Sequence, residues 1–345
     1  MSAPDRKRTG GIRGIFSGRI VLSIAIFAAI CLLFPVFLKD RYSQHFAWKI
    51  LFGALIASAW NIAGGYAGQF SLGHAAFLGI GAYSSTLLMM HFGISPWIGM
   101  LAGGLIAALF AAAFGYLTLR LRGPFFVLCT IAFAEVLRII AVYWSSLTHG
   151  SEGISIPFRP GFSNMMFSGR LYYLYIILGA VFIVFLVSDA LQRSRLGYYM
   201  AAMREDEDAA ETLGVDTIRV KLISIALSAF FTAVGGTLYA QYILFIEPAT
   251  VLGIDFSVQV ALISIIGGMG TSVGPILGSL LMTPTGEFLR ATFADSAQGM
   301  QLIIYGTLLI VFVIFMPRGL AAGISRLRDL WVRGQARRAG SVDRA

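Results

Sequence analysis

Two ionisable residues, Glu135 and Arg138, lie three positions apart within an apolar stretch of the sequence. Side chains at this spacing share one face of a helix, and a lone charge in the middle of a membrane span costs about 2.5 to 3.5 kcal/mol. We therefore expect the carboxylate and the guanidinium to form an ion pair. The pair would line a transport pathway or the seam between two halves of the protein, or it would be a structural pair near the end of its span; the sequence leaves these alternatives open.

The other residues that could do chemistry do not form a recognisable catalytic or metal site. His74 has no second histidine, cysteine or carboxylate near it in the sequence, which favours a packing or hydrogen-bonding role over metal binding. Cys31 and Cys129 are isolated in apolar stretches, so neither a disulfide framework nor a zinc site is expected. Segment 270–274 fits the Gly-x-Ser-x-Gly pattern of hydrolases, but that fold needs a later histidine, and the last one is His149.

The composition excludes a water-soluble globular protein. Hydrophobic residues make up 57% of the 345 residues and charged residues 12%, with a mean hydropathy of +0.79, whereas a soluble domain carries about 25% charged residues. The net charge of +9 does not form a basic stripe with interleaved aromatics, so no nucleic-acid partner is expected. None of the lysines follows a glycine, so the chain has no phosphate loop with which to hydrolyse ATP, and it is not expected to be an enzyme.

Ten apolar stretches are long enough to be membrane helices. They cover residues 20–37, 46–63, 74–91, 97–118, 124–144, 171–189, 220–243, 255–268, 275–291 and 300–316. A helix satisfies its own backbone hydrogen bonds in lipid, and these stretches are much longer than barrel strands. The predicted fold is therefore all-α, a polytopic membrane protein of about ten transmembrane helices. The first stretch follows a basic tail but has no small-residue cleavage site, which favours a retained span over a cleaved secretory signal.

The distribution of Lys and Arg predicts the orientation of the chain. With a cytoplasmic N-terminus, ten spans, and basic residues near the end of a stretch counted in the adjoining loop, 19 of the 26 basic residues fall in cytoplasmic segments. Six fall outside and one, Arg138, lies within a span. Cytoplasmic loops carry such an excess of positive charge. We therefore predict a cytoplasmic tail at 1–19, a transmembrane domain at 20–316 that includes a polar cytoplasmic loop at 190–219, and a basic cytoplasmic tail at 317–345, with both termini in the cytoplasm.

Two glycine-rich segments, 64–74 and 267–278, interrupt the apolar sequence without adding charge. Such breaks free backbone groups that must bond to protein or to a water-lined cavity, and paired breaks in two halves of a chain indicate a transport pathway. An inverted repeat is expected to relate the halves. The small-residue spacings in both segments are also typical of tight helix packing without any substrate contact. The residues assigned to the translocation pathway are Gly64, Gly65, Tyr66, Gly68, Gln69, Ser71, His74, Glu135, Arg138, Gly267, Gly268, Gly270, Thr271 and Gly274.

The longest polar stretch between spans has an acidic and alanine-rich centre at 204–214. Acidic residues suit the N-terminal end of a helix dipole, and Gly214 suits a C-terminal stop, so we predict a short cytoplasmic helix. Such a helix can lie in a groove on another protein and pass motion to the spans beside it; a solvated charged loop is the alternative. The residues assigned to this contact are Arg204, Glu205, Glu207, Asp208, Ala209, Ala210 and Gly214.

The sequence Asp208-Ala209-Ala210, with Gly214 four positions later, resembles the EAA loop of ABC importer permeases. The resemblance narrows to the LivM-like permeases of branched-chain amino acid ABC transporters. It rests on GGYAGQFSLGHAAF at 64–77, LRGPFF with AFAE between 121 and 135, Thr-x-Gly-x-x-Gly-Ile at 148–154 and GGMGT-x-x-GP at 267–275. These segments occur in the expected order across residues 60–280.

The resemblance implies a permease subunit of a bacterial inner-membrane ABC importer for branched-chain or other small apolar amino acids, whose polar loop contacts an ATPase. It implies as partners a second, homologous permease subunit, two ABC ATPase subunits that bind ATP and Mg²⁺, and a periplasmic substrate-binding protein, besides the amino acid and membrane lipid. No cofactor and no metal is expected in this chain. A permease for urea or short amides is one alternative. A self-contained secondary transporter is the other, and it leaves the acidic and alanine-rich loop unexplained.

Overall fold

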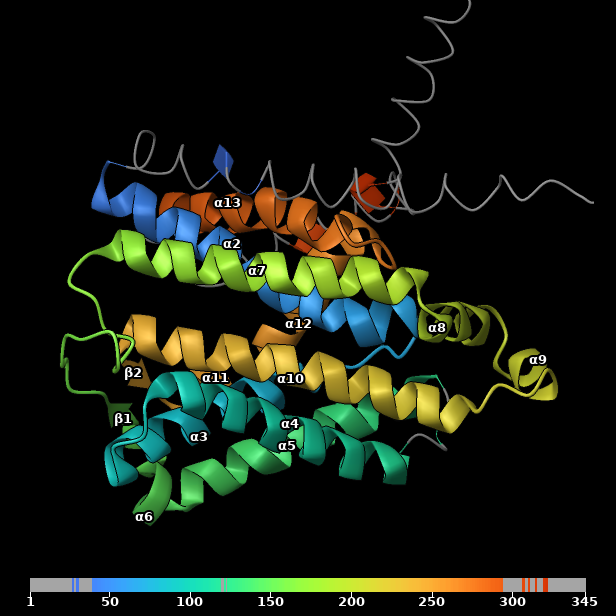
Figure 1. The fold of residues 1–345 in the computed structure, drawn as a ribbon, viewed down its shortest axis with the longest axis horizontal. Coiled ribbons are helices and arrows are strands. Elements are labelled where there is room, and N and C mark those ends of the chain that lie inside the picture. The colour runs from blue at the N-terminus through green and yellow to red at the C-terminus, as the bar shows by residue number, and fades with distance from the viewer. Residues whose placement is uncertain are drawn as a thin grey trace, which may run out of the picture.

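The computed structural model describes residues 39–118, 121 and 123–293, together with single positions 27, 29, 30, 306, 307, 310, 314 and 319–321. Apart from these single positions, the spans predicted at 20–37 and 300–316 and the tails at 1–19 and 317–345 lie outside the described residues. Over the described ranges the chain is mostly helical, with one pair of short strands (Figure 1).

The helices follow one another along the chain with mostly short connections. They are α2 (Arg41–Asn61), continued by the π-helical turn η1 (Ile62–Tyr66), α3 (His74–Phe92), α4 (Pro96–Thr118), α5 (Pro124–Tyr143), α6 (Ser145–Thr148), the 3-10 turn η2 (Gly150–Glu152), α7 (Arg170–Arg193), α8 (Arg195–Glu205), α9 (Glu207–Thr212), α10 (Thr217–Ile243), α11 (Pro248–Val251), α12 (Ile254–Gly268) and α13 (Gly274–Phe293). The strands β1 (Ile154–Ser155) and β2 (Phe245–Ile246) pair antiparallel.

Seven helical stretches in the described part of the chain are long and apolar enough to cross a membrane. They are Arg41–Tyr66, His74–Phe92, Pro96–Thr118, Pro124–Tyr143, Arg170–Arg193, Thr217–Ile243 and Pro248–Gly268. Each coincides with one predicted stretch, which confirms an all-α, polytopic membrane fold. The stretch predicted at 275–291 is helical as part of α13 but is not among the seven. The total of ten spans and the inverted repeat stay predictions.

The helix ends follow from local chemistry. The Asp216 carboxylate accepts a hydrogen bond from the Arg219 backbone N–H at 3.1 Å and caps α10, as a side-chain oxygen does at an N-cap. Pro124 stands in the first turn of α5, where its missing N–H leaves no bond unmade. Gly93, with a φ of +64°, ends α3. Because such stop signals border the apolar runs, the observed spans begin and end close to the predicted ones.

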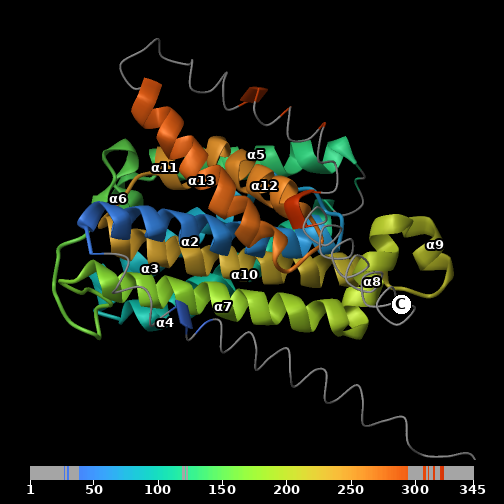
Figure 2. The same ribbon diagram turned by 90° about the horizontal axis from the view of Figure 1, so that it is seen from above.

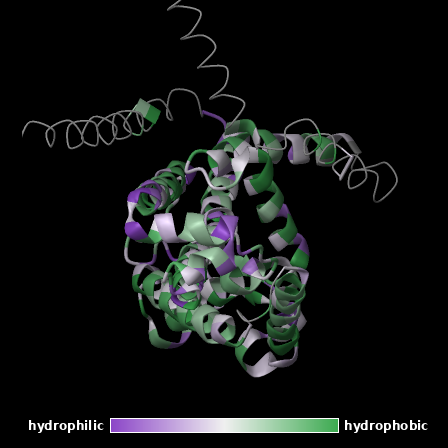
Figure 3. Cartoon of the chain, turned by 90° about the vertical axis from the view of Figure 1, so that its right-hand side faces the viewer, coloured by the Kyte–Doolittle hydropathy of each residue, from purple (hydrophilic) through white to green (hydrophobic). Residues whose placement is uncertain are grey.

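The long helices lie side by side, and their connections gather at two ends of the bundle (Figure 1). One end, which we call the α8–α9 end, carries α8, α9, the end of η1 and the start of α10. The other, the β1–β2 end, carries α6, both strands, the start of α7 and the end of α10. In the view onto the α8–α9 end, hydrophobic residues dominate the helices and hydrophilic segments face the viewer (Figure 3). Both glycine-rich segments therefore lie at the same end as the acidic and alanine-rich loop.

The helices α2 and α10 form the centre of the bundle. α10 packs against α2, α3 and α4, while α2 also packs against α7, α12 and α13 and lies between α7 and α13 in the view from above (Figure 2). Small residues bring α3 and α10 into contact: a Cβ at Gly81 would lie 2.0 Å from the Ala233 carbonyl oxygen. By contrast, α5 exposes many apolar side chains, including Leu128 and Tyr143. That exposure fits a helix that borders lipid or another subunit.

Candidate functional site

The polar loop at 190–219 contains two short helices, of which α9 is the helix predicted within 204–214 and α8 precedes it. α8 begins after Ser194, whose hydroxyl accepts a hydrogen bond from the Gly197 N–H at 3.1 Å. α9 begins after Asp206, whose carboxylate accepts from the Ala209 N–H at 3.0 Å. The break falls at Asp206 because its extended backbone ends one helix and its side chain caps the next. Gly214, with a φ of +86°, follows α9, as a C-terminal stop should.

The two alanines of α9 differ in burial. Ala210 is 2% exposed, whereas Ala209 and its neighbour Asp208 are exposed. Glu207 holds α9 on the bundle, because its Oε1 accepts a hydrogen bond from Lys221 Nζ of α10 at 2.5 Å, and the Lys221 side chain is only 9% exposed. Removing one partner of such a shielded pair leaves a poorly solvated charge. The surface of α9 open to a partner protein is therefore formed by Asp208, Ala209, Glu211 and Thr212, and not by Ala210.

Arg204, the penultimate residue of α8, reaches from the loop to both glycine segments. Its Nη1 donates to the Gly65 carbonyl oxygen at 3.0 Å, and its Nη2 lies 3.3 Å from Glu205 Oε1. A Cβ at Gly270, in the second segment, would lie only 2.4 Å from the same Nη1. Gly68 borders the stem of the side chain, since a Cβ there would lie 2.9 Å from Arg204 Cγ. One guanidinium thus connects the predicted contact loop to the two breaks.

The glycine segments are also joined directly, through Asn61. Its Nδ2 donates to the Thr271 carbonyl oxygen and its Oδ1 accepts from the Gly270 N–H, both at 2.9 Å. The Ser264 hydroxyl lies 3.4 Å from the same Oδ1. Gln192, near the end of α7, donates to the Gly270 carbonyl oxygen at 2.9 Å. Both backbone groups of Gly270 are therefore held by side chains from other helices, and Asn61 itself is 1% exposed.

Close backbone contacts explain why these segments contain glycine. At Gly65 a Cβ would lie 1.8 Å from Asn61 Oδ1. At Gly267 it would lie 1.9 Å from the Gly274 carbonyl oxygen, and at Gly274 it would lie 2.2 Å from the Gly268 carbonyl oxygen. Distances under 3 Å exclude a side chain unless the backbone moves. Tight packing is thus one role of these glycines, and a role in the translocation pathway stays a prediction.

The first segment begins as a buried turn over Trp60. A Cβ at Gly64 would lie 2.4 Å from the Trp60 ring, and Tyr66 is buried directly after it. The Trp60 Nε1 then donates to the Ser71 carbonyl oxygen at 2.8 Å. The chain therefore leaves η1, turns and comes back against α2 before α3 starts.

Residues 69–74 then run along α10 into the bundle. The Ser224 hydroxyl lies 3.3 Å from Gln69 Oε1, and one turn further along α10 the Ser228 hydroxyl bonds to His74 Nε2 at 2.8 Å. His74 is fully buried at this point. In the described part of the chain no group of three His, Cys, Asp or Glu side chains could hold a metal ion. The structure thus gives His74 a hydrogen-bonding role between α3 and α10.

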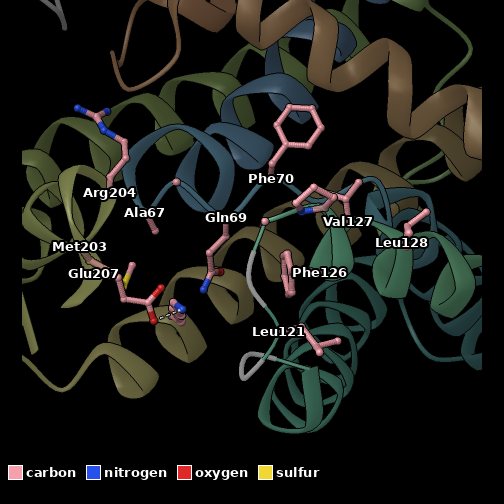
Figure 4. Close-up of a pocket in the computed structure, with 14 residues that line it drawn as sticks. Ala67, Gln69, Phe70, Leu121, Phe126, Val127, Leu128, Met203, Arg204 and Glu207 are labelled. Atoms are coloured by element: carbon pink, nitrogen blue, oxygen red, sulfur yellow. Dashed lines mark hydrogen bonds and ion pairs between the residues drawn. The ribbon is translucent and has the colours of Figure 1, made fainter.

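A cavity of about 720 Å³ opens between this segment, α5 and the α8–α9 pair (Figure 4). Gln69 points into it, with Phe126 and Leu121 on one side and Glu207 on the other. Gln69 is 6% exposed, and its Nε2 has no hydrogen-bond partner among the described residues. Lys221, paired with Glu207, also lines the space. A buried amide donor, one ion pair and apolar walls thus meet beside the first glycine segment and Arg204.

Glu135 and Arg138 form the predicted ion pair on α5. Arg138 donates through Nε to Glu135 Oε2 at 2.9 Å and through Nη2 to Oε1 at 2.5 Å. The two side chains are 44% and 33% exposed, respectively, and neither lines the cavity at the α8–α9 end. The structure therefore brings them together with each other and places them outside the group formed by Arg204, Asn61 and the glycines.

Three residues at the α8–α9 end that make these contacts were not identified from the sequence: Asn61, Gln192 and Lys221. Asn61 carried a usable signal, because an amide inside an apolar stretch must find hydrogen-bond partners in the protein. Gln192 and Lys221 stand at the ends of spans, where polar residues are ordinary. Nothing local in the sequence distinguishes them from solvated residues.

The fold and the site define a class of protein. Long apolar helices with two broken segments, joined to each other and to a polar element at one end, are typical of membrane transporters. Residues 44–313 match the family described as branched-chain amino acid transport system, permease component, and the chain belongs to this family.

Individual relatives agree with this family. The chain is 28% identical over 307 residues to the high-affinity branched-chain amino acid transport system permease protein LivM of Salmonella typhimurium, covering 82% of this chain and 71% of the relative. It is 26% identical over 283 residues to LivH of the same organism, covering 77% and 90%. It is also 26% identical over 274 residues to the nucleoside ABC transporter permease protein NupC of Lactococcus lactis subsp. cremoris, covering 74% and 86%. No solved structure gives a significant match. The resemblance to LivM-like permeases is confirmed.

Proposed function

We propose that this chain is the transmembrane permease subunit of an ABC importer for branched-chain or other small apolar amino acids. Substrate moves by alternating access while partner subunits hydrolyse ATP. Membership of the family and similarity to LivM and LivH support the transporter class and the substrate. The observation that carries the mechanism is the contact of Arg204 with Gly65 and its approach to Gly270.

In the proposed mechanism, an ATPase binds the exposed face of α9 and moves α8 with it. Arg204 then pulls or releases the carbonyl of Gly65 and presses on Gly270. Because Asn61 bonds to the second segment, the ends of α2 and α12 shift together. Alternating access needs such a link to favour one of two conformations. The cavity beneath α8 and α9, with Gln69 pointing into it, is the proposed inner end of the pathway.

The proposed assembly places the chain in the bacterial inner membrane with the α8–α9 end and both termini in the cytoplasm. The segments 1–19, 119–123 and 317–345, which are predicted to be cytoplasmic, contain basic residues. Together with the basic residues of the polar loop they support this orientation. Two ABC ATPases bind there and hold ATP and Mg²⁺, and no cofactor is assigned to this chain. A second, homologous permease completes the membrane part, and a periplasmic substrate-binding protein delivers the amino acid to the β1–β2 end.

Uptake by the reconstituted complex tests this function. Proteoliposomes holding both permeases and the ATPases are loaded with ATP, and labelled leucine is added outside with the binding protein. Uptake that needs both ATP and the binding protein is expected. Uptake driven by an ion gradient without ATP would instead identify a secondary transporter. Competition by urea, with none by isoleucine or valine, would show that the substrate is urea or a short amide.

A further inference from the structure

A second cavity lies at the β1–β2 end, enclosed by α2, α10, α13 and the residues of α11 and α12. Its volume is about 560 Å³, within the range of about 300–1,000 Å³ usual for small-ligand sites. None of its lining residues belongs to the glycine segments. In the orientation proposed above, this cavity faces the periplasmic side.

An ion pair between two helices forms the polar part of the cavity. Lys49 Nζ of α2 donates to Glu287 Oε2 of α13 at 3.0 Å, and the two side chains are 30% and 26% exposed. Asp255, at the start of α12, adds a second carboxylate to the lining. Lys49 lies within the span Arg41–Tyr66, and a charged residue inside a membrane helix is rare and commonly marks a substrate pathway.

The rest of the lining offers apolar surface that its neighbours hold in place. Trp48 stacks on Tyr242 with ring centroids 3.9 Å apart, and Phe52 lies against Tyr239 and Phe256 with centroids 5.5 and 6.0 Å away. The buried apolar residues of the lining are Trp48, Phe52, Ile56, Val260 and Ile263. A rigid apolar wall thus stands beside one positive and two negative groups.

Resting on the proposed importer function, we propose that this cavity binds a zwitterionic α-amino acid with an apolar side chain. The ligand carboxylate accepts hydrogen bonds from Lys49, and the ligand ammonium donates to Glu287 or Asp255. The aliphatic side chain packs on Phe52 and Phe256. Because the ligand and the Lys49–Glu287 pair are each close to neutral overall, Lys49 and Glu287 can each exchange one opposite charge for another, and Asp255 is a further carboxylate of the lining.

This arrangement selects by charge pattern as well as by shape. A carboxylic acid without an amine engages Lys49 but offers Glu287 no cation in exchange, and an amine without a carboxylate offers Lys49 no anion in exchange. An uncharged urea or nucleoside cannot compete with the existing pair for either partner. A phosphatidylethanolamine headgroup also carries an ammonium and an anion, so the experiment must separate a lipid from a free amino acid.

Equilibrium binding of labelled leucine to the complete complex tests the proposal. The complex is placed in nanodiscs of phosphatidylglycerol without binding protein or ATP. Saturable binding is expected, with competition by isoleucine and valine. Competition by 4-methylpentanoate and by 3-methylbutylamine should be at least tenfold weaker, because each lacks one charge. Added phosphatidylethanolamine should leave leucine binding unchanged; displacement of leucine by this lipid would assign the cavity to a headgroup and overturn the proposal.

Substitutions of the ion pair localise the binding. Lys49→Gln and Glu287→Gln should each weaken leucine binding at least tenfold, equivalent to about 1.4 kcal/mol. The double variant removes both charges at once, so it stays informative if a single variant fails to assemble. Asp189→Asn is the matched control. Asp189 pairs with Arg193 at 2.9 Å, with side chains 27% and 32% exposed, near the other end of the bundle, so this variant should bind leucine normally.

The outcomes separate this inference from the function on which it rests. If the wild-type complex takes up leucine with ATP and the double variant binds leucine as tightly as the wild type, the cavity proposal is wrong and the importer function stands. If the wild-type complex transports no branched-chain amino acid, the proposed function itself fails.

Discussion

Replacing Arg204 with alanine tests whether this side chain transmits motion from α8 to the glycine segments. The substitution removes the 3.0 Å hydrogen bond from the guanidinium to the Gly65 carbonyl and empties the space beside Gly270. A hydrogen bond to a charged group contributes about 1.5 to 3 kcal/mol. The Arg204 side chain is 38% exposed, so screening by water favours the lower value, about 1.5 kcal/mol. Since about 1.4 kcal/mol changes an equilibrium tenfold, leucine transported per ATP hydrolysed should fall about tenfold.

The assay measures leucine uptake and phosphate release in the same proteoliposomes. In Arg204→Ala we expect ATP hydrolysis to continue while uptake falls, because the ATPase keeps its docking surface and loses its connection to the breaks. Arg219→Ala is the control. Arg219 carries the same charge near the same end of the bundle, but its side chain is 82% exposed and pairs with Asp216 at 2.8 Å. Unchanged uptake per ATP in Arg204→Ala, or an equal loss in Arg219→Ala, would refute the reasoning.

Three further predictions concern the packing around the same site. Gly65→Ala should prevent assembly or lower the melting temperature of the detergent-solubilised complex strongly, because the new Cβ would lie 1.8 Å from Asn61 Oδ1. Gly179→Ala, whose Cβ would have no atom of the described residues within 4 Å, should leave that temperature equal or higher. Equal behaviour of the two variants would contradict the packing argument. Asn61→Asp replaces the donor to the Thr271 carbonyl with an oxygen, so it should destabilise the complex by about 1–3 kcal/mol in thermal denaturation; an unchanged melting temperature would exclude the bridge. Lys221→Met breaks the pair with Glu207 and should speed hydrogen exchange in residues 206–214, while unaltered exchange there would show that the pair does not hold α9.

The membrane spans could be predicted from the sequence because each is a long apolar run with local stop signals. The π-helical turn that extends α2 to Tyr66 was not predicted, because it carries the helix three residues past the stretch 46–63 into the first glycine segment. The pairing of Glu135 with Arg138 followed from helical spacing alone. Gly214 was recognisable because a helix end with a positive φ favours glycine. All of the features that were predicted depend on residues within a few positions of one another.

The site itself depends on contacts between distant parts of the chain, which a single sequence does not encode visibly. Arg204 looked like one charge in a polar loop, and its bond to Gly65 joins residues 139 positions apart. Asn61 and Gly270 are 209 positions apart. Ala209 and Ala210 seemed equivalent as small residues of one surface. Their opposite burial follows from Asp206, which starts a new helix and thereby sets which face of α9 meets the bundle.

Cross-linking from α9 tests the central claim most directly. Ala209→Cys is introduced after replacement of Cys31 and Cys129, and the assembled complex is treated with a short, reducible cross-linker. We predict that the exposed position joins the ATPase subunit, that leucine uptake stops when the link forms, and that a reductant restores it. If the complex forms and transports leucine, yet position 209 joins no ATPase or the linked complex transports at the normal rate, then α9 does not receive the motion that drives this permease.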